Sequence, residues 1–206
     1  MTDELGLPPD AFAKMDGEDD AIFYREPRLV THIDDAAIAA LTLFYRSRLP
    51  QQGAILDLMS SWVSHLPSGS VFSRVIGHGM NAAELAANPR LDRFFVQDLN
   101  REPTLPLESA SIDAVLICAS IQYLEQPVAV LREAARVLKG GGEIIVSFSN
   151  RCFPTKAVAI WRALDIRRQA GLVSLYMEKA GFTGGDVALL VDGSRSDPLV
   201  AAVGWK

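Results

Sequence analysis

Apolar residues along the chain follow two alternating patterns, one typical of buried strands and the other of amphipathic helices. Nearly continuous apolar runs of strand length occur at residues 54–59, 71–76, 93–96, 112–118 and 143–148. Apolar positions spaced three or four residues apart predict helices over residues 34–49, 81–88, 127–138, 155–169 and 172–180. Because strands alternate with helices, the pattern predicts a parallel sheet with crossover connections.

The last two apolar segments predict a different connection. Residues 186–191 and 199–205 have strand character, and only the polar loop 192–198 separates them. Since this loop is too short for a crossover, the two strands are expected to be antiparallel. The predicted fold class is therefore α/β, with a doubly wound, seven-stranded and mostly parallel sheet that ends in an antiparallel C-terminal hairpin.

Charge is distributed unevenly and divides the chain into two parts. Seven acidic residues and one lysine give residues 1–20 a charge of −6, so the remaining residues carry +1 of the total of −5. We expect residues 1–20 to be an acidic flexible leader and residues 21–206 to form a single domain. A nearly neutral domain does not indicate nucleic acid as a partner.

The composition indicates the cellular compartment and argues against membrane spans, disulfide frameworks and metal sites. No apolar run approaches the ~18 residues that a membrane span needs, and the acidic start is unlike a signal peptide. The two cysteines, Cys118 and Cys152, match neither a disulfide framework nor a metal-binding pattern. We therefore expect a cytoplasmic protein without a metal site or a membrane partner.

The first candidate functional residue along the chain is Asp57, near the end of the first apolar strand. Ligands of open α/β sheets bind at the carboxyl ends of the strands, and a buried carboxylate needs a partner. That partner is either the ammonium of a cofactor or a set of backbone amides. Residues 58–65 contain no glycine. This excludes a nicotinamide dehydrogenase, because a Gly-x-Gly-x-x-Gly turn is what lets a pyrophosphate reach the helix.

In the order and spacing of four segments, residues 34–206 resemble the class I S-adenosylmethionine-dependent methyltransferases of the type 11 branch. The segments are Ile55–Leu58, Phe95–Leu99, Leu107–Val115 and Leu131–Phe148. The resemblance implies a Rossmann-like methyltransferase fold with a terminal hairpin, and S-adenosylmethionine as the cofactor.

The resemblance also implies which residues bind that cofactor. Asp57 and the loop after it would hold the methionine part, Asp98 would accept the adenine amino group, and Leu99 would cover the ring. Cys118 ends the fourth strand, which is the wall between cofactor and acceptor in the family. The candidate cofactor-binding residues are Asp57, Met59, Ser60, Ser61, Gly79, Met80, Asn81, Asp98, Leu99 and Cys118.

The chain departs from the family pattern at two places. The usual glycine-rich loop is degenerate, and Gly79 stands where family members have an acid that holds the ribose hydroxyls. Asn81 either replaces part of that acid or caps the following helix. His65 and His78 are each either a base near neutral pH or a histidine satisfied within its loop.

Three residues are candidates for the acceptor side of the site. Tyr123 follows the fourth strand, and Asn150 and Arg151 follow the fifth, where loops carry substrate contacts. Arg151 either grips an anionic acceptor or pairs with a carboxylate elsewhere. The segment Phe23–Arg28 either closes over the cofactor as a lid or covers the edge of the sheet.

Two functions fit these residues. The first is an S-adenosylmethionine-dependent methyltransferase acting on a small-molecule acceptor, because residues 118–121 lack the Asn/Asp-Pro-Pro-aromatic element of amino-directed family members. Methyl transfer from a sulfonium is an in-line displacement whose leaving group needs no protonation, so no catalytic triad or metal set is expected. The alternative is a non-catalytic binding or scaffolding protein that keeps the fold and has lost normal cofactor binding.

Overall fold

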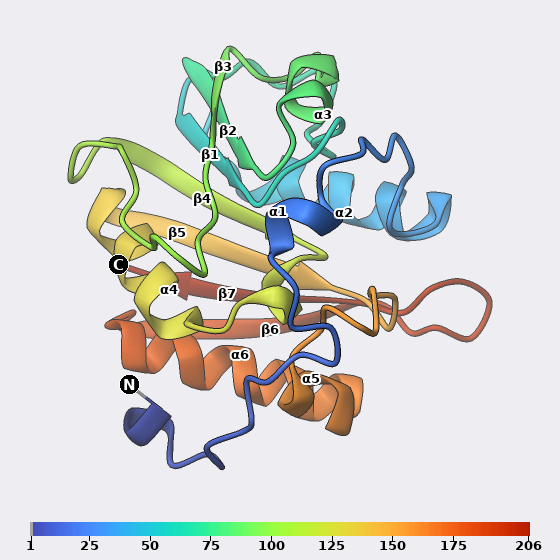
Figure 1. Cartoon of the computed structure of the whole chain (residues 1–206). Helices are drawn as coiled ribbons and strands as arrows, with labels where there is room; N and C mark the ends of the chain where they lie inside the picture. Colours follow the sequence, from blue (N-terminus) through green and yellow to red (C-terminus); the bar gives the residue numbers. More distant parts are fainter. Residues whose placement is uncertain (1) are drawn as a thin grey trace.

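The fold is built on one twisted sheet of seven strands in the order β3-β2-β1-β4-β5-β7-β6 (Figure 1). The computed structural model describes residues 2–206. The strands are β1 Ala54–Leu58, β2 Arg74–Gly79, β3 Arg93–Val96, β4 Ile112–Cys118, β5 Leu138–Phe148, β6 Gly184–Val191 and β7 Leu199–Trp205. β7 is antiparallel to both β5 and β6, whereas the pairs among β1 to β5 are parallel. The predicted fold class is confirmed.

Helices cover both faces of the sheet. They are the 3₁₀ turns η1 Thr2–Leu5 and η2 Ile121–Tyr123, and the α-helices α1 Asp20–Phe23, α2 Asp35–Arg48, α3 Ala82–Ala87, α4 Pro127–Val137, α5 Ala159–Ala163 and α6 Ile166–Ala180. Helix α2 packs its buried stripe against one face, and α4 and α6 pack together against the other. All five residues of β1 are buried, as expected for a strand covered on both sides.

Two parts of the helix prediction need correction. The segments 155–169 and 172–180 are not two helices of that extent, because α5 is a single short turn and α6 continues through Gly171. Asp165 starts α6 by accepting a hydrogen bond from the backbone N–H of Arg168 at 2.9 Å. A glycine inside a helix costs about 1 kcal/mol. Burial of the α6 stripe that includes Val173 and Tyr176 outweighs that cost.

Two crossover connections contain no helix, and this shapes the site. Residues 59–73, between β1 and β2, and residues 97–111, between β3 and β4, run as turns and irregular backbone. Most crossovers between parallel strands carry a helix. Here the backbone after β1 is therefore held by side chains and by neighbouring loops instead of by a helix of its own.

Residues 11–20, part of the expected flexible leader, lie against the domain in the structure. Ala11 and Phe12 are buried in the core cluster that contains α4 and α6. The backbone of this segment pairs with the chain around α5, where the N–H groups of Ala159 and Ile160 donate to the carbonyls of Ala13 and Ala11 at 2.9 and 2.8 Å. The segment then continues into α1.

A buried lysine anchors the end of this segment. The side chain of Lys156 is fully buried, and its ammonium lies 3.1 Å from Asp16 and 3.2 Å from Asp20. It also donates to the carbonyl oxygen of Glu18 at 2.8 Å. Lys14 forms a second ion pair with Asp20. Acidic residues of the leader thus neutralise a charge that the domain buries.

Replacing this lysine tests the anchor. Lys156→Met should lower the free energy of unfolding by about 3 kcal/mol, because it leaves Asp16 and Asp20 short of a buried partner. It should also make the chain before α2 more sensitive to limited proteolysis. Urea denaturation and proteolysis followed by mass spectrometry measure both effects. Lys179→Met, at an exposed ammonium 3.9 Å from Glu178, is the matched control and should change stability by less than about 0.5 kcal/mol. Equal losses in the two variants would contradict the anchoring role.

Candidate functional site

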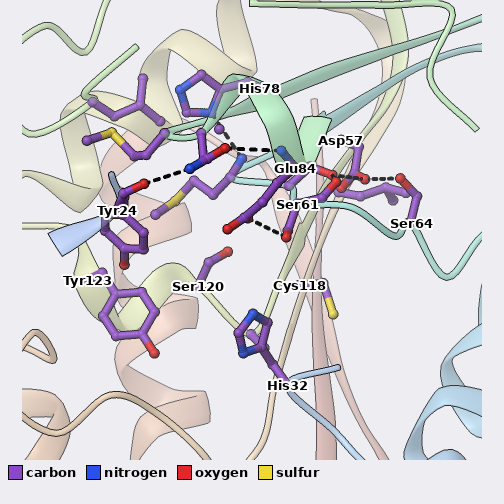
Figure 2. Close-up of a pocket in the computed structure, with 18 of the residues that line it drawn as sticks. Tyr24, His32, Asp57, Ser61, Ser64, His78, Glu84, Cys118, Ser120 and Tyr123 are labelled. Atoms are coloured by element: carbon purple, nitrogen blue, oxygen red, sulfur yellow. Dashed lines mark hydrogen bonds between the residues drawn. The ribbon is translucent and has the colours of Figure 1, made fainter. Parts of the chain in front are cut away.

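A pocket opens where β1, β2 and β4 end, beneath a strap formed by residues 20–33 (Figure 2). β1 and β4 are neighbours in the sheet, and the chain order reverses between them. Open α/β sheets bind their ligands at this kind of switch point. All ten candidate cofactor-binding residues line the pocket, so the structure brings them together in one cavity.

Asp57 lies at the floor of the pocket. Its carboxylate is almost fully buried and accepts hydrogen bonds from the hydroxyls of Ser60, at 2.6 Å, and Ser64. Burial raises the pKa of Asp57 to about 6, although both hydroxyls act in the opposite direction. No lysine or arginine among residues 2–206 forms an ion pair with it. The carboxylate is therefore charged at neutral pH without a cation beside it.

The loop after β1 holds its shape without glycine. Met59 has a φ of 59°, in the left-handed region that favours glycine. A non-glycine residue there costs roughly 1–2 kcal/mol. His78 of β2 fixes the strained turn, because its Nδ1 accepts from the Met59 N–H at 3.1 Å and its carbonyl oxygen accepts from the Ser60 N–H at 2.6 Å.

His65 and His78, which the sequence left open as either bases or satisfied residues, both carry neutral rings. The Nε2 of His78 lies 3.0 Å from the carbonyl oxygen of Gln97, so the ring uses both nitrogens to join β1, β2 and the end of β3. Burial lowers the pKa of His78 to about 4. Burial also lowers the pKa of His65 to about 4. Both rings are therefore unprotonated near neutral pH, and the two engaged nitrogens of His78 favour a structural role for it.

Gly79 has no room for the acid that family members carry at its position. A Cβ atom on Gly79 would lie 2.5 Å from the carbonyl oxygen of Ser60. The acid comes instead from α3, where the buried Glu84 lines the pocket. Its carboxylate accepts from the hydroxyl of Ser61 at 2.6 Å and from the backbone N–H of Arg28 at 2.7 Å.

Sequence reasoning missed Glu84, although one signal was present. Glu84 is three residues after Asn81, and that spacing is typical of a capping box. Asn81 does cap α3, since its amide oxygen accepts from the N–H groups of Ala83 and Glu84 at 2.9 and 3.1 Å. Its amide nitrogen donates to the carbonyl oxygens of Tyr24 and Arg25 in the strap. Asn81 is therefore occupied as a cap, and Glu84 turns toward the pocket.

The end of β3 contributes a second polar group and an apolar one. Asp98 accepts from the backbone N–H of Asn100 at 2.9 Å and lies 3.6 Å from the guanidinium of Arg101. Leu99 is buried next to it, and Met80 lines the pocket from the end of β2. A carboxylate beside two apolar side chains can accept an amino hydrogen while apolar atoms cover a ring.

The end of β4 forms the opposite wall. Burial raises the pKa of Cys118 to about 12, so its thiol is protonated at neutral pH and packs as a small apolar side chain. Ala119 has a φ of 50°, and Ser120 follows with a buried hydroxyl that has no hydrogen-bond partner among residues 2–206. The ring of Tyr123 lines this side of the pocket.

The strap covers the pocket, which favours the lid interpretation of Phe23–Arg28. Besides the contacts of Asn81 and Glu84, the indole N–H of Trp62 donates to the carbonyl oxygen of Val30 at 2.9 Å. Tyr24 and His32 project from the strap into the pocket. Burial lowers the pKa of His32, which has no hydrogen-bond partner among the described residues.

Two of the three predicted acceptor-side residues lie outside this pocket. Arg151 pairs with Asp197 at 2.5 Å, which is the alternative that the sequence left open. It borders an adjoining hollow that shares Tyr123, His32 and Phe153 with the main pocket. Asn150 is exposed.

Residues 2–206 contain neither a metal-binding cluster nor a helix able to cross a membrane. They contain no group of three or more histidine, cysteine, aspartate or glutamate side chains placed to hold a metal ion. None of their helices combines the length and the apolar character needed to cross a membrane.

Comparisons with known proteins agree with the geometry. Residues 61–146 match the family model described as a methyltransferase domain. A solved methyltransferase from Thermotoga maritima, described as a possible histamine N-methyltransferase, is 19% identical with a TM-score of 0.58, covering 82% of this chain and 88% of its own. The [4+2]-cyclase SpnF is 16% identical with a TM-score of 0.62, covering 88% and 89%.

A third solved structure shares the fold over half of its own length. Phosphoethanolamine N-methyltransferase 2 from Haemonchus contortus, in complex with S-adenosylhomocysteine, is 14% identical with a TM-score of 0.54, covering 82% of this chain and 52% of its own. Comparison with curated protein sequences gives no match. The methyltransferase family model thus matches residues 61–146, and most of the chain shares the fold of solved S-adenosylmethionine-dependent methyltransferases.

Proposed function

We propose that this protein is an S-adenosylmethionine-dependent methyltransferase that acts on a small-molecule acceptor. The observation that carries the proposal is the pair of buried carboxylates, Asp57 and Glu84, in one pocket at the ends of β1 and β2. Their hydrogen-bond partners are hydroxyls and a backbone N–H, and no ion pair joins either to a lysine or arginine among residues 2–206. A ligand with positive charge is the missing partner.

S-adenosylmethionine has the charges and the polar groups that this pocket would receive. Asp57 would hold the ammonium of its methionine part, with the loop 59–61 beside it. Glu84 would accept the ribose hydroxyls, because a carboxylate that already accepts two hydrogen bonds retains lone pairs for more. Asp98 would accept the adenine amino group, and Met80 and Leu99 would pack on the ring.

The bound cofactor supplies a methyl group on a positively charged sulfur. The remaining work of the chain is to place an acceptor atom in line with that methyl group and to exclude water. The strap supports both tasks, because it lines the pocket with Tyr24, Val30 and His32. An acceptor that fits beneath the strap is a small molecule, whereas a macromolecule would have to displace it.

A second candidate is a protein of this fold that does not transfer methyl groups. The hydroxyls of Ser60 and Ser64 already donate hydrogen bonds to the carboxylate of Asp57, so it needs a cationic ligand less. The loop 58–65 also lacks the glycines that give a cofactor close access to the backbone. The structural neighbour SpnF is described as a [4+2]-cyclase, so the fold alone does not determine the reaction.

Cofactor binding distinguishes the two candidates. Titration calorimetry with S-adenosylhomocysteine should give saturable binding to the unaltered protein. Asp57→Asn and Glu84→Gln should each weaken it about 30-fold, or about 2 kcal/mol, the value of a hydrogen bond to a charged group. Asp186→Asn, on exposed β6, is the matched control and should bind as the unaltered protein does. Absence of heat at millimolar ligand would support the non-catalytic candidate.

Asp57→Asn should also stabilise the ligand-free protein. The pKa of Asp57 rises from 3.8 to about 6 on folding, so its ionisation above pH 6 opposes folding by about 3 kcal/mol. Asparagine removes this cost and loses part of the hydrogen bonding. We expect the free energy of unfolding at pH 7.5 to rise by about 1–2 kcal/mol, measured by urea denaturation. At pH 4, where the carboxyl is protonated, the gain should vanish. A loss of stability at pH 7.5 would contradict this account.

The affinity for S-adenosylhomocysteine should fall in acid. Asp57 takes up a proton below about pH 6, and a neutral carboxyl attracts an ammonium weakly. We expect the dissociation constant to rise about tenfold between pH 7 and pH 5. His65 and His78, with a pKa of about 4 each, stay neutral over this range. The dissociation constant of the Asp57→Asn variant should not change between pH 7 and pH 5. If it changed as much as that of the unaltered protein, Asp57 would not be the source of the pH dependence.

Gly79→Ala tests the close contact between β2 and the loop after β1. The added Cβ would lie 2.5 Å from the Ser60 carbonyl oxygen and must push the loop away. Overpacking of this kind costs about 1–3 kcal/mol, and binding of S-adenosylhomocysteine should weaken at least tenfold. Gly140→Ala, where a Cβ meets nothing within 4 Å, is the control. Unchanged binding by Gly79→Ala would show that the loop position does not matter for the ligand.

A further inference from the structure

The wall of the pocket opposite the two carboxylates carries polar groups without partners. The hydroxyl of Ser120 is buried and makes no hydrogen bond with residues 2–206, and it lines the pocket. His32 lines the same wall from the strap and likewise has no hydrogen-bond partner among the described residues. Figure 2 shows Ser120 between Tyr123 and His32, on the side away from His78. Buried polar groups in proteins are normally satisfied, so the Ser120 hydroxyl indicates a ligand. The half-buried His32 lines the pocket beside it and can share that ligand.

The strained backbone of Ala119 fixes the position of the next residue, Ser120. Ala119 has a φ of 50° at the end of β4, where the strand turns into η2. Met59, on the neighbouring strand, is the other left-handed residue that lines the pocket. Backbone strain of this kind concentrates at functional sites, where it fixes the direction of a side chain. Here it directs the Ser120 hydroxyl toward the cavity.

Aromatic rings surround these two polar groups. Phe153 lies at the junction of the main pocket and the adjoining hollow. Its ring is 6.0 Å from that of Tyr123 in a stacked arrangement and 5.6 Å from that of His32 at 81°. Tyr24 of the strap lines the pocket as well. Walls of this kind favour a flat, aromatic occupant.

The charges of the pocket disfavour an acceptor with a net negative charge. Its acidic lining residues are Asp20, Asp57, Glu84 and Asp98, and no lysine or arginine lines it. The arginine beside the adjoining hollow, Arg151, is engaged by Asp197. A carboxylate or phosphate on the acceptor would meet mainly like charge among the residues that line the pocket. The acceptor is therefore not an anion when it binds.

We propose that the acceptor is a neutral planar phenol, with its ring against Tyr123 and Phe153 and its hydroxyl between Ser120 and His32. This inference rests on the proposed function, because it names the acceptor of the same pocket. In the transfer step, the phenolic oxygen forms a bond to the methyl carbon while the sulfur–carbon bond breaks. The phenolic proton passes to the unprotonated ring nitrogen of His32 and then to solvent. The products are an aryl methyl ether, S-adenosylhomocysteine and a proton.

His32 suits this role on chemical grounds. A free phenol ionises near pH 10, so it is neutral in water at pH 7 and becomes a strong nucleophile only when a base takes its proton. An imidazole without a hydrogen-bond partner is free to accept that proton. An aliphatic alcohol has a much less acidic hydroxyl and no flat ring for the aromatic wall, so it should bind poorly here.

Binding of 4-nitrophenol to the protein saturated with S-adenosylhomocysteine, at pH 6 where the free probe is mostly un-ionised, tests the proposal. The absorption band of the bound probe should shift to longer wavelength, as expected for a phenol hydrogen-bonded to a base. His32→Gln should abolish that shift. His32→Gln and Ser120→Ala should each lower the affinity for the probe about five- to tenfold. Both variants should bind S-adenosylhomocysteine within twofold of its normal affinity. Cyclohexanol, of similar size but not flat, should compete at least tenfold less well than phenol.

Ser174→Ala is the matched control for the serine. Its hydroxyl donates to the carbonyl oxygen of Ala170 within α6, on the exposed side of that helix, and it lies outside the pocket. The proposal is overturned if His32→Gln and Ser120→Ala bind the probe as Ser174→Ala does, or if cyclohexanol competes as well as phenol. Failure of S-adenosylhomocysteine to bind would reject the proposed function instead. The same probe titration without it would then decide whether the aromatic site exists.

Discussion

The backbone of Ser60 passes directly over Gly79, and the rest of the site follows from this contact. A side chain on Gly79 would lie 2.5 Å from the Ser60 carbonyl oxygen, so β2 cannot end in an acid. The contact also holds the loop after β1 in place, because the Ser60 N–H donates to the carbonyl oxygen of His78 at 2.6 Å. No helix follows β1 to fix this loop. Close packing against β2 does so instead.

The acid that β2 lacks comes from the next element along the chain. Glu84 reaches the pocket from the first turn of α3 and joins the loop through Ser61 and the strap through the N–H of Arg28. One carboxylate therefore connects three segments that are far apart in sequence. Glu84 and Asp57 give the pocket a negative charge that hydroxyls and N–H groups only partly satisfy. A cationic ligand would stabilise this arrangement by supplying the missing counter-charge.

The covering strap connects the acidic start of the chain to the pocket. Lys156 is buried beneath α1, and Asp16 and Asp20 neutralise it. Residues beyond α1 then cross the pocket, where Asn81 and Trp62 hold the backbone. A buried ion pair contributes little net stability, but it fixes a position, since removing one partner leaves an unpaired charge. The ionic anchor thus sets where the strap begins, and hydrogen bonds at the rim set its path.

The sequence by itself determined the sheet and the location of the pocket. Apolar periodicity depends on local spacing, so it revealed the strands, the main helices and the antiparallel hairpin. Strand ends share one edge of a parallel sheet, so residues such as Asp57 and Asp98 could be placed together before their contacts were known. Only the tertiary structure determined that Glu84, Ser120 and His32 line the pocket. Glu84 has the spacing of a capping residue, and the other two have no motif around them. Their importance depends on burial, on partners that are absent, and on backbone from distant segments, none of which local sequence encodes.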